Sequence, residues 1–172
     1  WLTTRTDLPL RRLWTVLTIL PLVIPSYVGA FLFVSALGPK GLLQQGLEAP
    51  FGVGRLPEIY GLPGATMALA LLSYPYILLI VRSSMSGMDP AMEESARSLG
   101  RGPIKTFFTV TVPLLRPAIA AGALLVALYV LSDFGAVSLM RYETFTWSIY
   151  QQYQGAFDRS IAAVLSLVLV GL

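Results

Sequence analysis

The chain of 172 residues contains no cysteine and no histidine, and only 12% of its residues are charged. Without cysteine there is no disulfide and no thiolate metal site, and without histidine the commonest metal ligand and the commonest general base are missing. A soluble domain carries about 25% charged residues, whereas here 55% of the residues are hydrophobic. Glycine and proline are too few and too scattered for a fibrous or disordered chain. The composition therefore predicts a polytopic membrane protein, with a very apolar soluble helical bundle as the alternative.

Apolar runs along the chain decide between these two classes. A spanning helix needs about 20 mostly apolar residues, and three runs supply them: Leu13–Leu37, Leu62–Val81 and Pro117–Leu139. A fourth run begins at Ile161 and is still apolar at Leu172. Because the chain begins with Trp1 and ends within an apolar run, we expect a single transmembrane domain, residues 1–172, cut at both ends. The pattern predicts an all-α, polytopic transmembrane helical bundle with about four spans.

Basic residues are unevenly shared between the loops of this bundle. Residues 1–12 and 82–116 together hold eight Lys and Arg, against four in residues 38–61 and 140–160. Cytoplasmic loops collect Lys and Arg, so the first pair of loops is predicted to be cytoplasmic and the second pair external. The same rule accounts for the net charge of +3. Because the basic residues flank apolar runs and form no dense cluster, nucleic acid is not an expected partner.

The cytoplasmic loop of residues 82–116 carries the signals of a short helix. Asp89 is a good N-cap and Pro90 suits the first helical position. Glu93 and Glu94 follow near the positive end of the helix dipole, and Gly100 suits a left-handed C-cap. A second helix, Ile104–Val112, is predicted to end at Pro113. Local physics alone allows a well-capped connecting loop as readily as a functional helix–turn–helix.

The spacing within this loop resembles a known signature. Glu94-Ser95-Ala96, three residues, Gly100, nine residues and then Val110-Thr111-Val112-Pro113 closely match the EAA motif of ABC-transporter permeases. Ser95 stands where the family has Ala, and Val112 where it has Leu. The flanking segments Met88–Pro90 and Leu114–Pro117 also resemble the family. The chain is thus identified as a member of the binding-protein-dependent permeases, with the MetI-like core of type I importers as its implied fold.

The resemblance implies a role for the short helix as the coupling helix, which docks on a cytosolic ATPase subunit. Its charged side chains would supply salt-bridge partners at the rim of the contact, and its small ones would allow close approach. The residues implied in coupling are Asp89, Pro90, Glu93, Glu94, Ser95, Ala96, Arg97, Gly100 and Pro113.

Further partners and a location follow from the same resemblance. The chain has no phosphate-binding loop, so ATP and Mg²⁺ are expected to be used by the partner ATPase, and this chain to bind no cofactor and no metal and to be no enzyme. A second permease half, a periplasmic or lipid-anchored substrate-binding protein and the lipid bilayer are the other implied partners. The implied location is the inner (plasma) membrane of a bacterium.

The substrate is indicated less sharply. Asp133–Ser138 and Thr146–Tyr150 resemble segments of ferric iron permeases, which are often fused double repeats. Permeases for thiamine, polyamines, sulfate or molybdate share the same core and stay open as alternatives. From other classes, a secondary transporter or a membrane segment without a transport role stays open as well.

A few residues inside the apolar runs are candidates for the translocation pathway. Prolines free a backbone carbonyl and bend a helix, which suits a hinge or a cavity wall, although proline is also simply tolerated in membrane helices. An acid within an apolar run is a functional candidate by default, although near the outer surface it can be hydrated. The candidates are Pro21, Pro25, Tyr74, Pro75 and Asp133.

Overall fold

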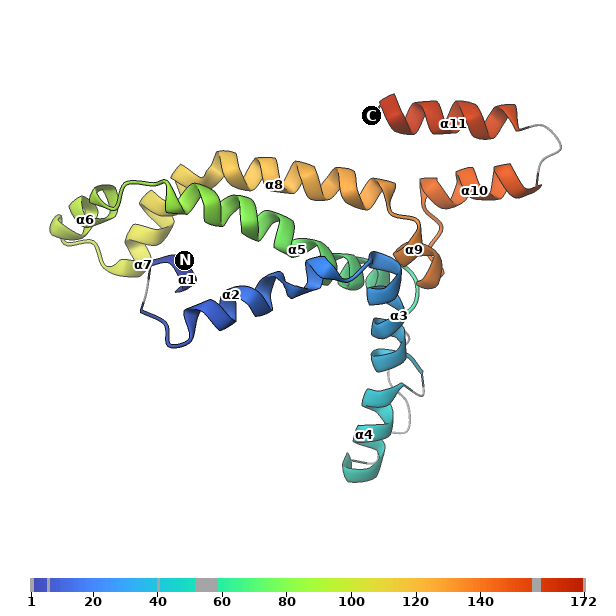
Figure 1. Ribbon diagram of the computed structural model, residues 1–172, viewed down its shortest axis with the longest axis horizontal. Coiled ribbons are helices and arrows are strands. Elements are labelled where there is room, and N and C mark those ends of the chain that lie inside the picture. Colours follow the sequence, from blue (N-terminus) through green and yellow to red (C-terminus); the bar gives the residue numbers. More distant parts are fainter. Residues whose placement is uncertain (1, 6, 40, 52–58, 156–158, 172) are drawn as a thin grey trace. The chain divides into compact units, whose positions relative to one another are not determined.

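The computed structural model describes residues 2–5, 7–39, 41–51, 59–155 and 159–171, and every regular element in these ranges is helical (Figure 1). The elements are α1 Leu2–Arg5, α2 Arg11–Ile19, the 3₁₀ helix η1 Leu20–Val23, α3 Ser26–Leu37, α4 Leu42–Phe51, α5 Leu62–Ser86, α6 Ala91–Ser98, α7 Pro103–Thr106, the π-helix η2 Phe107–Thr111, α8 Val112–Ser132, α9 Gly135–Leu139, α10 Phe145–Gly155 and α11 Ser160–Gly171. The predicted all-α fold is confirmed.

Three helical segments of the described chain are long and apolar enough to cross a membrane: Ser26–Gly46, Leu62–Ser86 and Pro103–Ser132. The first range includes Lys40, which lies outside the described residues. The second begins at Leu62 as predicted and continues five residues past Val81. The apolar helix α11 is shorter, from Ser160 to Gly171. Polytopic architecture is therefore supported by length and composition, although the bounds of all three predicted spans differ from those in the structure.

The predicted first span, Leu13–Leu37, is wrong as a single helix. The run divides into α2, η1 and α3, and Pro25 has the extended angles φ −55° and ψ 142° just before α3 begins. Proline lacks an N–H and disfavours the α conformation in the residue before it. Pro21 and Pro25, four residues apart, therefore interrupt a run that hydropathy alone reads as continuous.

The predicted third span, Pro117–Leu139, is also displaced. Residues Pro103–Ser132 form one continuous helical segment of 30 residues, which passes through the π turn η2 and through both Pro113 and Pro117. Pro113 thus does not end a helix, contrary to the prediction from the sequence. In the π turn the N–H of Val112 bonds to the carbonyl of Phe107, and such a widened turn gives the ring of a following proline more room.

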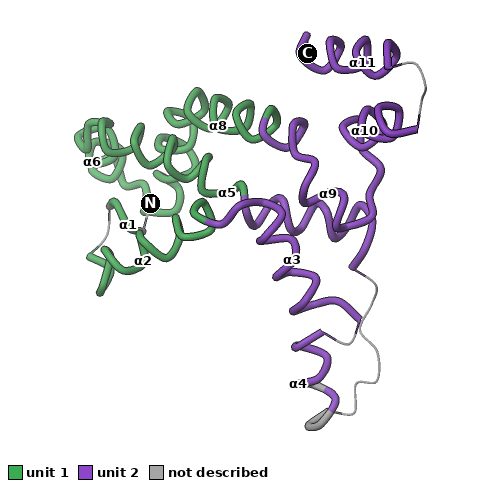
Figure 2. The backbone as a smooth tube through the Cα atoms, turned by 45° about the vertical axis from the view of Figure 1, so that its right-hand side comes forward, with its two compact units in different colours: residues 1–23, 73–128 green, residues 24–72, 129–172 purple. Residues whose placement is uncertain are grey.

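The chain divides into two compact units (Figure 2). Unit 1 comprises residues 1–23 and 73–128, and unit 2 comprises residues 24–72 and 129–172. In unit 1, Gly122 of α8 lies against Ile77 of α5, where an added Cβ would come within 3.1 Å of the Ile77 Cα. Helix α6 belongs to the same unit and lies in the loop that joins these two helices (Figure 1).

Unit 2 has a core of small apolar side chains. It brings together α3, the first part of α5 and α9, with the residues Ala30, Ala65, Ala68, Leu69, Ala136, Val137 and Met140 all buried. Glycines extend this close contact: a Cβ on Gly135 would meet the Tyr27 Cβ at 2.9 Å. Membrane helices associate through small residues that let their backbones approach, which explains why this core contains so much alanine.

Candidate functional site

Helix α6 begins with the cap that the sequence predicts. The Asp89 carboxylate accepts a hydrogen bond of 2.9 Å from the N–H of Ala91. Pro90 has the helical angles φ −59° and ψ −27° and directly precedes Ala91, the first residue of α6. Its backbone thus already follows the helix, as predicted for a proline in the first turn. An N-cap acid satisfies one of the free N–H groups of the first turn, so the capping role predicted for Asp89 is confirmed.

The other end of α6 is closed by a Schellman motif. Gly100 has φ +80°, the N–H of Gly100 bonds to the carbonyl of Arg97 at 2.9 Å, and the N–H of Arg101 bonds to the carbonyl of Ala96 at 3.2 Å. This pair of bonds defines the motif, and its left-handed position favours glycine. A Cβ at Gly100 would meet nothing within 4 Å, so glycine is required here by the backbone conformation and not by space.

Only two side chains of α6 are buried in this chain, Glu93 and Ala96. They lie three residues apart and therefore on one face of the helix. The remaining residues of the helix are exposed, among them Glu94, Ser95 and Arg97, and Met92 is 50% exposed. The exposed face of α6, which carries charged and small side chains, is thus accessible to a partner. The opposite face packs against the rest of unit 1 through Glu93 and Ala96.

The buried acid has a specific partner. The Thr111 hydroxyl donates a hydrogen bond of 2.8 Å to Oε1 of Glu93, and both residues are buried, Glu93 at 6% and Thr111 at 0% exposure. The coupling role implied by the resemblance places Glu93, like Glu94, at the rim of a docking surface. For Glu93 that placement is wrong, because the three-dimensional contact with Thr111 turns its carboxylate inward.

Thr111 belongs to the π turn η2, and sequence reasoning missed it. In an α-helix residues five apart lie about 140° from each other, but i→i+5 bonding brings them close to one face. Thr106 and Thr111 are accordingly both buried. The Thr106 hydroxyl has no hydrogen-bond partner within the described structure. A π turn leaves no periodic signal in a sequence, although two threonines five apart within an apolar segment are consistent with one.

A second, exposed contact joins the same two segments. Nη1 of Arg101 donates to the Thr109 hydroxyl at 3.1 Å, and that hydroxyl donates to the carbonyl of Lys105 at 2.7 Å. The segment after α6 is therefore connected to η2 at Thr109, and α6 itself at Thr111. The predicted coupling residues thus fall into three groups: Asp89, Pro90 and Gly100 at the two ends of α6, the inward-facing Glu93 and Ala96, and the exposed Glu94, Ser95 and Arg97. Pro113 belongs to none of these, since it lies within α8.

The candidate pathway residues are dispersed. Pro21 lies in η1 and Pro25 just before α3, while Pro75 is fully buried inside α5 and Tyr74 is 37% exposed. Two of the three boundaries between the units fall after Val23 and after Leu72, within three residues of Pro21, Pro25 and Pro75, whereas the third falls after Leu128. That position agrees with a hinge, and the hinge role stays a prediction.

Asp133, the fifth candidate, has a structural role. It lies between α8 and α9 instead of inside a span, because α8 ends at Ser132. Its carboxylate accepts a hydrogen bond of 2.8 Å from the N–H of Ala136, as an N-cap does. The side chain is 8% exposed. Capping of α9 is by itself a structural reason for an acid at this position. A role for Asp133 in the translocation pathway stays a prediction.

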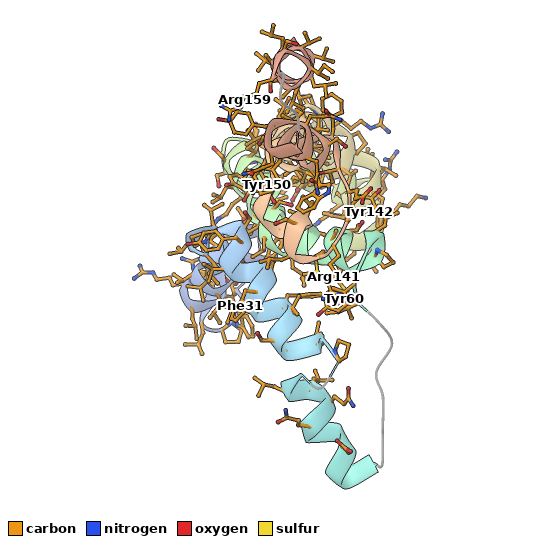
Figure 3. The ribbon with its side chains drawn as sticks, turned by 90° about the vertical axis from the view of Figure 1, so that its right-hand side faces the viewer. Phe31, Tyr60, Arg141, Tyr142, Tyr150 and Arg159 are labelled. Carbon is orange, nitrogen blue, oxygen red and sulfur yellow. The ribbon has the colours of Figure 1, made fainter. Side chains whose placement is uncertain are left out.

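Unit 2 also contains an aromatic cleft of about 480 Å³. Phe134 stacks on Trp147 at 5.8 Å and contacts Tyr150 at 5.0 Å between ring centroids. Arg159 lines the same cleft, and its guanidinium carbon lies 4.6 Å from the centroid of the Tyr153 ring. Figure 3 labels Arg159 and Tyr150. Nearby in sequence, Arg141 has the left-handed angle φ 54° and covers the Tyr60 ring at 4.7 Å (Figure 3).

The curated proteins that the chain resembles include permeases for ferric iron and for molybdenum. The chain is 36% identical over 153 residues to the Fe(3+)-transport system permease protein FbpB 2 of Haemophilus influenzae, which covers 89% of this chain and 26% of that protein. It is 34% identical over 136 residues to the molybdenum transport system permease protein ModB of Escherichia coli, covering 79% of this chain and 58% of that one. The chain thus spans about a quarter of the first relative and somewhat over half of the second.

Comparison with solved structures gives the same fold. A bacterial alginate ABC transporter, crystallised in complex with an alginate pentasaccharide-bound periplasmic protein, superposes with a TM-score of 0.68 at 18% sequence identity, covering 98% of this chain and 66% of that one. The family described as binding-protein-dependent transport system inner membrane component matches residues 2–172. This match covers nearly all of the chain, including the capped α6 loop, and the chain therefore belongs to that family of ABC-importer permeases.

Proposed function

We propose that this chain is part of the membrane-spanning permease subunit of an ATP-driven, binding-protein-dependent importer, and that α6 is the helix that docks on a separate ATPase. The observation that carries the proposal is the form of α6. It is capped at both ends, it rests on its own chain through two side chains only, and it leaves a face of charged and small residues exposed. Exposed charges and small side chains on a short helix with both ends capped suit close, charge-complementary contact with a partner.

This docking assigns a role to each subunit of the importer. The partner ATPase would bind ATP and Mg²⁺ and would close and open, and the movement of α6 would shift the spans so that the pathway faces the two sides of the inner membrane in turn. A second permease half would complete the pathway. A periplasmic binding protein would deliver the substrate, and the alginate transporter, which was crystallised with its substrate-bound periplasmic protein, supports this kind of partner.

Ferric iron is the substrate that we favour, because the ferric permease of H. influenzae matches 89% of this chain. Molybdate is the second candidate, since ModB of E. coli is nearly as similar. The full-length transporter with its binding protein, reconstituted in vesicles, should take up radiolabelled ferric iron and leave molybdate outside. Uptake of molybdate alone would replace the substrate and leave the permease role intact.

The docking role is tested by substitutions at exposed positions of α6. In the full-length transporter, Glu94→Lys reverses an exposed charge and Gly100→Asp strains the left-handed cap. Both variants should insert normally, yet lose transport and copurify with less ATPase. The matched control is Gly102→Asp, because Gly102 has the ordinary φ of −65° and open space around it. Wild-type transport and full ATPase retention in both α6 variants would refute the docking role, and transport without ATP would indicate a secondary transporter.

Orientation is tested by single cysteines, which this cysteine-free chain reports without background. The unequal distribution of Lys and Arg predicts that Arg97→Cys is labelled from the cytoplasm and Glu48→Cys from outside. Both side chains are exposed in the chain. Labelling of both cysteines from the same side of the membrane would contradict the proposed topology.

A further inference from the structure

The hydrogen bond between Glu93 and Thr111 connects two functional parts of the chain that lie 18 residues apart. Glu93 belongs to α6, the proposed docking helix, and Thr111 is the last residue of η2, immediately before α8. The segment Pro103–Ser132 is continuous through η2 and is long and apolar enough to cross a membrane. The contact therefore joins the surface helix α6 directly to the N-terminal part of a candidate span.

The backbone connections of α6 are poorly suited to transmit movement. Exposed glycines lie on both sides of the helix, Gly87 before it and Gly102 after the Schellman motif that closes it. Glycine restricts the backbone least of all residues, so a displacement of α6 would be absorbed in these turns unless a side chain holds the helix to its unit. Ala96 offers one methyl group, and the Arg101–Thr109 contact is exposed to water, where a polar contact contributes little.

The Glu93–Thr111 bond has the properties that such a connection needs. It is removed from water, where hydrogen bonds are electrostatically stronger. It is directional, and breaking it leaves a buried donor and a buried acceptor without partners. It also depends on the π turn, which brings Thr111 onto the face of Thr106, whereas regular α-helical geometry would rotate it by about 140°.

We infer that the hydrogen bond between Glu93 and Thr111 acts as a strut, a rigid connection between α6 and the N-terminal end of α8. It makes the two move as one body when the ATPase displaces α6. This inference rests on the proposed docking of α6. Glu93 is then a positioning residue, which transmits force through Thr111 without touching the ATPase. Its exposed neighbour Glu94 makes the contact with the partner, so the two adjacent acids have different tasks.

The test uses the complete transporter in vesicles and measures transport, ATP hydrolysis and retention of the ATPase for each variant. Thr111→Val keeps the shape of the side chain and removes the donor, and Glu93→Met removes the acceptor at similar volume. Both should retain the ATPase and hydrolyse ATP, but transport about tenfold less substrate per ATP hydrolysed, as expected for loss of a buried hydrogen bond to a charged group. Thr111→Ser keeps the hydrogen-bond donor and Glu93→Gln keeps an acceptor. Each of these variants should therefore transport nearly as much substrate per ATP hydrolysed as the wild type.

The chain supplies a matched control on the same helical segment. Thr106 is as buried as Thr111, but its hydroxyl has no partner among the described residues. Thr106→Val therefore makes the same chemical change without removing a hydrogen bond, and coupling should stay at the wild-type value. Equal coupling losses in Thr106→Val and Thr111→Val would overturn the strut, because packing alone would then explain both.

The double variant Glu93→Met/Thr111→Val covers the case in which a single variant fails to fold. Replacing both partners by apolar groups is nearly neutral for stability, so this variant should fold and retain the ATPase while staying uncoupled. Wild-type coupling in the double variant would refute the strut.

If instead the Glu94→Lys and Gly100→Asp variants keep full transport and full ATPase retention, the docking proposal itself fails. Failure of the strut alone leaves those two variants defective and Glu93→Met coupled.

Discussion

Two regions of this chain are held together by different means. In unit 2, α3, α5 and α9 pack through alanines and a few larger apolar side chains. Around α6 in unit 1, the buried residues include Glu93, Thr106 and Thr111. Small residues suit helices in lipid, where no hydrophobic force drives their association and close backbone approach must supply the contact energy. A surface helix with two buried side chains lacks that contact area, and a directional polar bond holds it instead.

The largest expected effect is in the small-residue core of unit 2. A Cβ on Gly64, in the first turn of α5, would overlap the backbone carbonyl oxygen of Ile59. Since backbone cannot give way as a flexible side chain does, Gly64→Ala should lower the free energy of unfolding by about 3 kcal/mol. Denaturant titration of the detergent-solubilised protein measures this. The control, Gly46→Ala in α4, meets nothing within 4 Å and should be slightly stabilising.

The next effect separates the two adjacent acids of α6. Glu93→Ala leaves the Thr111 hydroxyl buried without its acceptor, and it should lower the free energy of unfolding by about 2 kcal/mol. Glu94→Ala, one residue along on the exposed side, should change it by no more than about 0.5 kcal/mol. The same titration measures both variants. Equal effects would mean that the polar anchor does not distinguish this region from the apolar core.

A smaller effect is expected at the C-terminal cap of α6. Gly100→Ala forces a residue with a Cβ into the left-handed conformation, at a cost of about 1 kcal/mol. Gly102→Ala is its control, because Gly102 has φ −65° and equally open surroundings. A difference between the two melting temperatures would show that the backbone angle matters. Identical melting temperatures would show that the Schellman motif is not needed for stability.

The smallest effect concerns a strained turn in unit 2. Arg141 adopts φ 54° while its guanidinium covers the Tyr60 ring (Figure 3). Arg141→Gly relieves the backbone strain but loses a cation–π contact of about 0.5–1 kcal/mol, so its stability should stay within about 0.5 kcal/mol of wild type. Arg141→Ala loses the contact and keeps the strain, and it should unfold at a lower temperature than Arg141→Gly. The reverse order would show that Arg141 bears no strain.

Local signals were predictable from the sequence and were found in place. Asp89 caps α6 and Gly100 ends it in the left-handed conformation, because both preferences depend on a few neighbouring residues. The start of α5 at Leu62 was also predictable, since the apolar run begins there. The bounds of helices that contain proline were not predictable in this way. Pro21 and Pro25 interrupt a predicted span, whereas Pro113 and Pro117 lie inside a continuous helical segment. Whether a proline breaks a helix depends on its neighbours, here a π turn.

The sequence by itself determined the membrane class, the helical fold and the family, because composition, hydropathy and fixed motif spacing are properties of the chain order. It also determined the caps of α6. Only the tertiary structure decided that Glu93 faces inward and Glu94 outward, and that Asp133 caps α9 instead of lying within a span. The two acids of α6 are equivalent in type and differ by about 100° around the helix. The contact that distinguishes them comes from Thr111, far along the chain, and no local pattern records it.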